Sequence, residues 1–135
     1  MVRFFETFVP GIPVQQGSKT AGVTKDGRPY VRDANAPKLR AWRQTLLEHL
    51  GGRGIHMDGM LRVSMTFYMP RPQRPEYERP AVKPDLDKLV RAVNDGLTAS
   101  GIIADDARIV SMRLDEYYAE SVMSPRGVYV SVEQV

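Results

Sequence analysis

The sequence contains no cysteine in 135 residues. Neither a disulfide framework nor a thiolate metal site can therefore form. No stretch approaches the ~18 apolar residues that a membrane span needs. The first apolar run is interrupted at Glu6 and Pro10, too early for a secretory signal peptide. We therefore expect a protein of a reducing cytoplasm.

The sequence also has little excess of charge of either sign. Its net charge is +3 and its pI is about 9.3. A nucleic-acid site must then come from local clustering of basic residues, because the overall field is only mildly positive. A hydrophobic content of 42% over 135 residues is typical of one globular domain, here residues 1–135, that buries roughly two thirds of its unfolded surface.

Hydrophobic patterns along the chain predict both strands and helices. Apolar residues at helical spacing, among them Trp42 and Leu46, indicate a helix from Ala36 to Leu50. The order of elements predicts an α+β fold, a mixed β-sheet with helices packed on it. Strands are expected at 3–9, 61–69, 107–118 and 127–134, the last two forming an antiparallel pair across a turn at 124–126, and a hairpin is expected at 21–32.

Two segments outside the predicted core carry clustered basic residues. The hairpin turns at Lys25-Asp26-Gly27 and is either a solvated edge hairpin or an arm that follows phosphates. Residues 70–84 hold five of the ten prolines, which excludes a helix or an internal strand. We expect a mobile loop there that meets the substrate, the alternative being a solvated linker. Its cations, expected to touch DNA phosphates, are Arg71, Arg74, Arg79 and Lys83.

The stretch from 83 to 106 places aspartates at both ends of a predicted helix. Asp85 and Asp87 open the helix, and Asp105 and Asp106 follow it in a loop. The apolar positions between them recur at helical spacing, so we expect that face to be buried against the sheet. These positions are Leu86, Leu89, Val90, Val93 and Leu97.

The aspartates have a structural and a chemical interpretation. Aspartate at a helix start caps free N–H groups, for about 0.5–2 kcal/mol, and paired aspartates are common in turns. A single cap would suffice, however, and Asp87 adds a second charge beside Lys88. Carboxylates near cations are what a hard divalent metal and a phosphodiester need. In this second interpretation the two acidic pairs lie close together and bind Mg²⁺ or Mn²⁺, which activates water and neutralises charge on the scissile phosphate.

The sequence KPDLDKLVRAVNDGL, followed by a short loop and DDARIV, resembles the RusA family of Holliday junction resolvases, which are crossover junction endodeoxyribonucleases. The family motif is a basic residue and often Pro, Asp-x-Asp, a helix that carries Asp-(Ala/Gly)-Leu, and Asp-Asp before a strand. The matching residues are Pro84, Asp85, Asp87, Asp95, Gly96, Leu97, Asp105 and Asp106.

The resemblance implies a small metal-dependent endonuclease of bacterial or phage-infected cytoplasm. Such enzymes act as homodimers on four-way DNA junctions and nick two strands symmetrically. In the family, both aspartates of the first pair and the second aspartate of the later pair are essential. The resemblance therefore implies that Asp85, Asp87 and Asp106 are essential here, with Asp105 as a further candidate metal ligand.

The helix also carries two candidate phosphate-contacting cations. Arg91 stands where the family has a functional Lys, and it keeps the charge without the ammonium chemistry. We expect Arg91 to stabilise charge that develops on the phosphate, the alternative being a surface ion pair with Asp87. Lys88 is expected to bind phosphate.

Two other classes of function remain open from the residues alone. The first is a nucleic-acid-binding or phage structural module without turnover, although such a binder gains nothing from carboxylates beside DNA. The second is an acidic-site protein of phosphate metabolism, which the lack of a Gly-rich phosphate loop disfavours. An EF-hand is excluded, because the required Gly and terminal Glu do not follow Asp85-x-Asp87.

Overall fold

The centre of the fold is a mixed four-stranded sheet. The computed structural model of the protein describes residues 3–17, 19–33, 36–121 and 124–135. The sheet has the order β1-β6-β4-β5, with β6 antiparallel to both of its neighbours and β5 parallel to β4. Its strands are β1 (Phe4–Pro10), β4 (Leu61–Met69), β5 (Ile109–Tyr118) and β6 (Gly127–Gln134).

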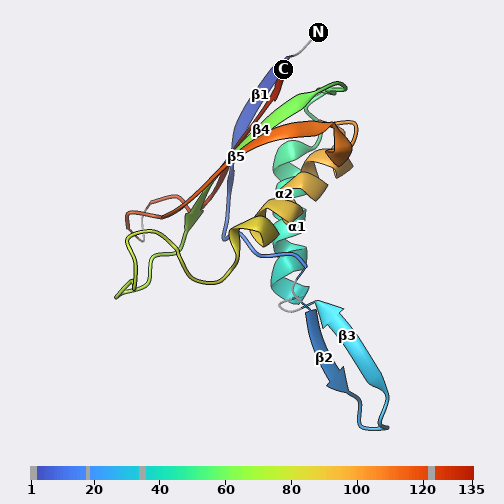
Figure 1. The fold of residues 1–135 in the computed structure, drawn as a ribbon, viewed down its shortest axis with the longest axis vertical. Helices are drawn as coiled ribbons and strands as arrows, with labels where there is room; N and C mark the ends of the chain where they lie inside the picture. Colours follow the sequence, from blue (N-terminus) through green and yellow to red (C-terminus); the bar gives the residue numbers. More distant parts are fainter. Residues whose placement is uncertain (1–2, 18, 34–35, 122–123) are drawn as a thin grey trace.

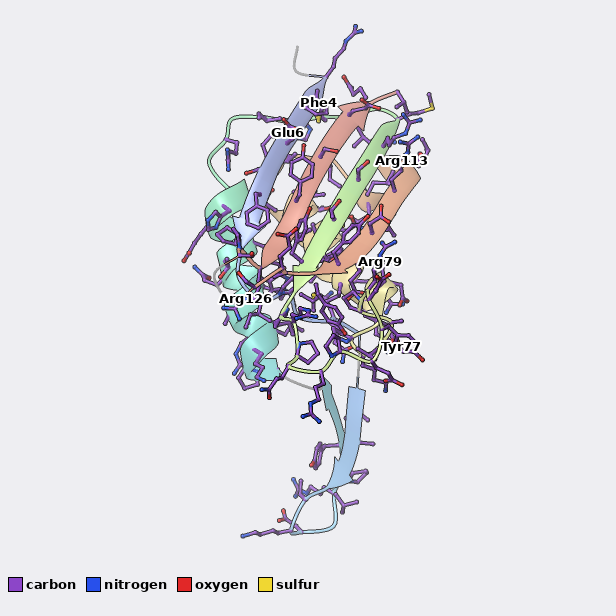
Figure 2. All side chains as sticks on the ribbon, turned by 90° about the vertical axis from the view of Figure 1, so that its left-hand side faces the viewer. Phe4, Glu6, Tyr77, Arg79, Arg113 and Arg126 are labelled. Atoms are coloured by element: carbon purple, nitrogen blue, oxygen red, sulfur yellow. The ribbon has the colours of Figure 1, made fainter. Side chains whose placement is uncertain are left out.

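Two helices cover one face of this sheet (Figure 1). They are α1 (Ala36–Leu50) and α2 (Leu86–Ala99). Side chains along β4 alternate between buried and half-buried, because every second residue of a strand points to the same face. Figure 2 looks onto the opposite face of the sheet. The expected α+β fold, a small domain with helices on a mixed sheet, is confirmed. None of the helices in the described ranges is long and apolar enough to cross a membrane.

The helices also pack against each other, and Gly96 allows their close approach. A Cβ at this position would meet Leu50 Cδ1 at 3.3 Å and Leu46 Cβ at 3.4 Å. Val93 and Leu97 on the same side of α2 are fully buried. The predicted apolar face of this helix is thus held between α1 and the sheet.

The predicted antiparallel pairing of the last two strands is wrong. β4 lies between β5 and β6 and is hydrogen-bonded to both. Because α2 connects β4 to β5 as a crossover, β5 runs parallel to β4. β6 then enters between β4 and β1, where both of its edges are paired. A turn signal at 124–126 indicates a reversal of the chain but does not say which strand receives the returning one.

The predicted hairpin forms a separate two-stranded sheet of β2 (Lys19–Val23) and β3 (Pro29–Asp33). It extends away from the main sheet beyond the start of α1 (Figure 1). Thr24 N donates to Arg28 O at 2.9 Å and closes the turn. Val23 and Val31 are 67% and 68% exposed, so these apolar side chains face solvent.

The proline-rich segment 70–84 crosses from β4 to α2 without regular structure, and Arg79 attaches it to β5. Its Nε donates to Glu116 O at 3.0 Å and its Nη2 to Asp115 Oδ1 at 2.9 Å. The guanidinium also lies 4.2 Å from the centre of the Tyr117 ring. The hydrogen bond to Asp115 raises the pKa of Arg79. The loop therefore has a fixed point, whereas Arg71 and Arg74 are exposed.

Glu116, beside this anchor, is a buried carboxyl group. It is 8% exposed, because β5 turns it to the helix-covered face together with Leu114 and Tyr118. Its Oε2 has no hydrogen-bond partner among the described residues. Burial raises the pKa of Glu116 to about 7, and attraction to the charge of Arg79 offsets this only in part.

The first prediction concerns mobility of the loop. Amides of residues 71–78 should exchange with solvent within seconds, because this stretch is exposed and carries few apolar contacts. Arg79→Ala should extend rapid exchange to residue 83, since the attachment to β5 is lost. Hydrogen–deuterium exchange measured by mass spectrometry checks this, with Arg71→Ala as the matched control. Strong protection of residues 71–78 in the unaltered protein would contradict a mobile loop.

The second prediction concerns stability against pH. The Glu116 carboxyl titrates near pH 4.5 when unfolded and near 7 when folded. Its protonated form therefore contributes stability at pH 4.5 and below, and that contribution is lost as the pH rises through 7. Between pH 5 and 8, the free energy of unfolding of Glu116→Gln should rise relative to that of the unaltered protein, by up to about 3 kcal/mol. Urea denaturation at both pH values measures the difference.

Glu120→Gln is the control for this experiment, because Glu120 is exposed. Its stability should follow that of the unaltered protein at every pH. Parallel curves for Glu116→Gln and the unaltered protein would show that Glu116 is not held neutral by the fold.

Candidate functional site

Asp85 occupies the N-cap position of α2 but does not cap it through its side chain. Its backbone is extended, with φ −69° and ψ 137°. Lys88 Nζ lies 3.5 Å from Asp85 Oδ2, and the Asp85 side chain is 46% exposed. The capping interpretation therefore fails for this carboxylate. The positive end of the helix dipole still favours negative charge at this position.

Asp87 projects from the first turn of α2 and faces Arg91, with 4.0 Å between Oδ2 and Nη2. Both side chains are more than half exposed, so this ion pair contributes only a few tenths of a kcal/mol. The N-terminal segment crosses α2 here. Gln16 N donates to Lys88 O at 3.0 Å, and a Cβ on Gly17 would meet Arg91 Nη1 at 2.5 Å. Arg91 is thus positioned by its neighbours beside the acidic start of the helix.

A further carboxylate, Asp95, lies two turns after Asp87 on the same side of α2. Gln16 Nε2 donates to Asp95 Oδ2 at 2.5 Å, and Arg43 Nη2 of α1 lies 3.9 Å from the same oxygen. Asp95 is one of the residues of the sequence motif, whereas its partners Gln16 and Arg43 lie outside the motif. Gln16 is 79 residues away in the chain, and no local pattern indicates that contact.

The second acidic pair lies at the other end of α2. Asp106 Oδ1 accepts a hydrogen bond from Thr98 Oγ1 at 2.5 Å. Asp105 accepts one from Ala107 N at 2.8 Å and so caps the 3₁₀ turn η1 (Asp106–Arg108). The Asp105 carboxylate therefore serves the turn, as the structural interpretation of the paired aspartates predicts. The Asp106 side chain is exposed.

The expectation that the two acidic pairs lie close together is wrong within one chain. Asp87 and Thr98 are eleven residues apart on α2, which places them about 16 Å apart along the helix axis at 1.5 Å per residue. Asp106 is hydrogen-bonded to Thr98. The loop is held at this end because Ile102 and Ile103 are buried. Spacing in sequence could not reveal this, because a helix between two motifs separates them by its full length.

The candidate DNA-contacting cations divide into two groups. Arg79 and Lys88 are paired with Asp115 and Asp85, respectively. Three others, Arg71, Arg74 and Lys83, are exposed and have no ion pair among the described residues. Lys83 immediately precedes the acidic start of α2, whereas Arg71 lies beside Glu120 and Arg126. Free charges of this sign suit a polyanion.

The donor set of one chain does not fit a divalent metal. Among the described residues, no three acidic or histidine side chains are grouped closely enough to hold an ion. Mg²⁺ and Ca²⁺ bind oxygen ligands at about 2.0–2.6 Å, so two carboxylates on one ion lie within about 5 Å of each other. The aspartates at the two ends of α2 are far outside that limit.

Comparison with known proteins shows where this chain belongs. The family described as "Endodeoxyribonuclease RusA" matches residues 10–133. The chain is also similar to the "Uncharacterized protein YqaN" of Bacillus subtilis (strain 168), with 26% identity over 124 residues, which cover 83% of this chain and 86% of that protein. Because the family match spans nearly the whole chain, from the last residue of β1 into β6, and includes the aspartates at both ends of α2, the protein is a member of the RusA endodeoxyribonuclease family.

Proposed function

We propose that the protein is a divalent-metal-dependent endodeoxyribonuclease that resolves four-way DNA junctions by paired, symmetric phosphodiester hydrolysis. Membership of the RusA family supports this class of activity. The observation that carries the proposal is the exposed acidic start of α2, with Asp85 and Asp87, directly after Lys83, an exposed cation without an ion pair among the described residues. It would act where such junctions arise, in the cytoplasm of a bacterial or phage-infected cell.

The working unit we propose is a homodimer whose copies share each acidic site. A twofold axis that crosses near the middle of α2 reverses the direction of the second helix. The start of α2 in one copy, which carries Asp85 and Asp87, would then face the end of α2 in the other copy, close to Asp106 of the partner subunit. Such a pairing would supply the oxygen ligands that one chain keeps apart. Mg²⁺ is the proposed ion, with Mn²⁺ as a substitute.

The remaining side chains have positioning and binding roles in this proposal. Arg91, exposed at the acidic start of α2, would stabilise charge on the scissile phosphate. Lys83, Lys88 and Arg74 would hold neighbouring phosphates, and Arg79 would keep the loop at this place through Asp115.

A second candidate is a DNA-binding module without turnover. The observation that favours it is the separation of the acidic pairs within one chain. The two candidates differ in metal binding, because a module without turnover has no use for a shared carboxylate site. Titration of the purified protein with Mn²⁺, followed by electron paramagnetic resonance, distinguishes them without any measurement of cleavage.

The third prediction tests the shared site by complementation. Asp87→Asn and Asp106→Asn should each abolish Mg²⁺-dependent cleavage of a four-way junction. When the two variants are co-expressed, half of the dimers are mixed, and each mixed dimer has one site without a lesion. Nicking should therefore return to about a quarter of the wild-type level. Labelled junctions and a matching linear duplex, with and without Mg²⁺, provide the assay.

Asp105→Asn serves as the matched control for this prediction, since its carboxylate already caps η1, and we expect a milder loss. Asp85→Asn mixed with Asp87→Asn should stay inactive, because both lesions lie in the same half of the site. If co-expression of Asp87→Asn with Asp106→Asn also gives no nicking, the shared site is refuted.

The fourth prediction separates DNA binding from chemistry. In EDTA, replacing Arg74 and Lys83 by Ala should weaken junction binding and lower the log–log salt slope by nearly one unit for each lost phosphate contact. Replacing Asp85 and Asp87 by Asn should leave affinity equal or higher, because repulsion between carboxylates and phosphates is relieved. Titrations at three salt concentrations measure both effects.

Arg53→Ala is the control for the salt slope, because Arg53 lies at the end of α1 against Phe5, away from the loop. Its slope should equal that of the unaltered protein. Much weaker binding by the aspartate variant in EDTA would mean that Asp85 and Asp87 support the structure instead of holding metal.

A further inference from the structure

The hairpin of β2 and β3 has no role in the proposed nuclease site. Its two strands pair with each other in a sheet of their own. The hairpin projects from the body of the protein beyond the start of α1 (Figure 1 and Figure 2). A single two-stranded hairpin is only marginally stable in water, because it buries little apolar surface by itself. A ribbon that projects in this way is therefore a candidate for contact with a partner molecule.

The hairpin carries most of the net charge of the protein. Residues 19–33 include four cations and two aspartates, which gives a net charge of +2 out of +3 for the whole chain. At the tip, Lys25 is exposed and has no ion pair among the described residues. Arg28 lies 4.0 Å from Asp26, and their side chains are 83% and 73% exposed, so this pair is weak. The charge of the hairpin favours a polyanion as the partner.

The two faces of the ribbon differ in character. Tyr30 lies against Gly22 of the opposite strand on one face, where glycine leaves room for the ring. Because side chains alternate along a strand, Val23 and Val31 lie together on the other face, where they are 67% and 68% exposed. An apolar face does not suit the phosphate backbone. It does suit the floor of the major groove of DNA, where thymine methyl groups are exposed.

The hairpin starts beside the proposed nuclease site. Gln16 N donates to Lys88 O of α2 at 3.0 Å, and a Cβ on Gly17 would meet Arg91 Nη1 at 2.5 Å. The strand β2 begins two residues after Gly17. Its five residues span about 17 Å at about 3.3 Å per residue, which equals about five base pairs at 3.4 Å each. The hairpin can therefore reach DNA that lies beyond the acidic start of α2.

We propose that the hairpin lies in the major groove of one duplex arm of the bound junction, about five base pairs from the cleaved phosphate. Val23 and Val31 would face the floor of the groove, and Lys25 and Arg28 would contact phosphates at its edges. The major groove is about 12 Å wide and admits a two-stranded ribbon, whereas the minor groove is only about 6 Å wide.

The proposal rests on the proposed nuclease function and narrows its substrate class to branched DNA whose arms are duplex. A ribbon in the groove holds the arm without unpairing any base. Since phosphates occur along every duplex and thymine methyl groups in most sequences, this contact positions the arm and adds little sequence preference. Each arm held in this way would be fixed at two places, near the crossover and about half a helical turn away.

Footprinting of the full-length protein on a four-way junction without Mg²⁺ tests the position of the hairpin. Dimethyl sulfate methylates guanine N7 in the major groove and adenine N3 in the minor groove. We expect protection of N7 about four to six base pairs from the crossover, with N3 at the same place left reactive. Lys25→Ala combined with Arg28→Ala should remove this protection. Lys25→Arg combined with Arg28→Lys keeps both charges and should retain it.

Binding to modified junctions measures the same contact. At 0.1 M salt, Lys25→Ala combined with Arg28→Ala should weaken binding roughly 10- to 100-fold and lower the log–log salt slope by nearly two units. Uncharged methylphosphonates in place of the phosphates about four to seven base pairs from the crossover should weaken binding of the unaltered protein to a similar extent. They should have no further effect on the double variant, because its cations are already absent. A full additional loss in that variant would overturn the proposed contact.

A second copy of this chain is the competing partner for the apolar face. Val23→Thr combined with Val31→Thr keeps the shape of both side chains and removes their apolar character. If sedimentation shows that this variant dissociates into monomers without DNA while the protection of N7 is unchanged, the face is a contact between copies and the groove proposal is overturned. Loss of the protection with an unchanged sedimentation coefficient supports the groove.

Nicking of the junction by the unaltered protein in Mg²⁺, measured in parallel, separates this proposal from the nuclease function. Nicking without protection of N7 in the arms overturns the groove contact while the nuclease function stands. Protection that depends on the charges of Lys25 and Arg28, without any nicking, supports the groove contact and overturns the nuclease function alone. Protection of adenine N3 in place of guanine N7 would put the hairpin in the minor groove and overturn the proposal.

Discussion

Burial of one apolar face of α2 between α1 and the sheet determines where the charged groups of the site can be. Leu89, Val93 and Leu97 are fully buried, so the helix cannot bend or slide without loss of core contacts that contribute several kcal/mol. Its fourteen residues form a rod about 20 Å long. Carboxylates attached to its two ends are therefore held apart by the hydrophobic core itself, and no adjustment of side chains can join them.

The loop after α2 is fixed with the same firmness. Met57 N donates to Ile102 O at 2.7 Å, and Ile103 N donates to Leu97 O at 3.3 Å. Both isoleucines are buried. Asp106 follows directly from this buried turn, and its position is a property of the fold. This is why we propose a metal site shared between two copies and not a rearrangement within one chain.

The sequence predicted the elements well and their pairing less well. Helical spacing of apolar residues located α1 at its observed bounds, because a helix carries its pattern locally. The neighbours of β6 depend on contacts with residues far along the chain, which no local pattern contains. The motif likewise identified the aspartates but not the distance between them.

Glu116, the buried carboxyl group beside the Arg79 anchor, was missed although its signal was present. It alternates with Leu114 and Tyr118 along β5, and this period of two predicts a carboxyl group on the buried face. The arginines of the proline-rich loop were treated as equivalent, yet Arg79 alone of Arg71, Arg74 and Arg79 has an ion pair among the described residues. Which arginine becomes an anchor depends on its reach to Asp115, and this becomes visible only when the loop is placed beside the sheet.

The position of β6 in the sheet has a consequence for synthesis of the chain. β1 is made first and β6 last, yet β6 is the strand to which β1 pairs, along seven residue pairs from Phe4 to Pro10. A ribosome therefore releases β1, both helices, β4 and β5 before β1 has any neighbour in the sheet. During that interval β1 and the near edge of β4 are both unpaired, which exposes the nascent chain to pairing with other strands. Completion of the sheet is a late event in the life of each molecule, because the strand that joins its two halves arrives at the end.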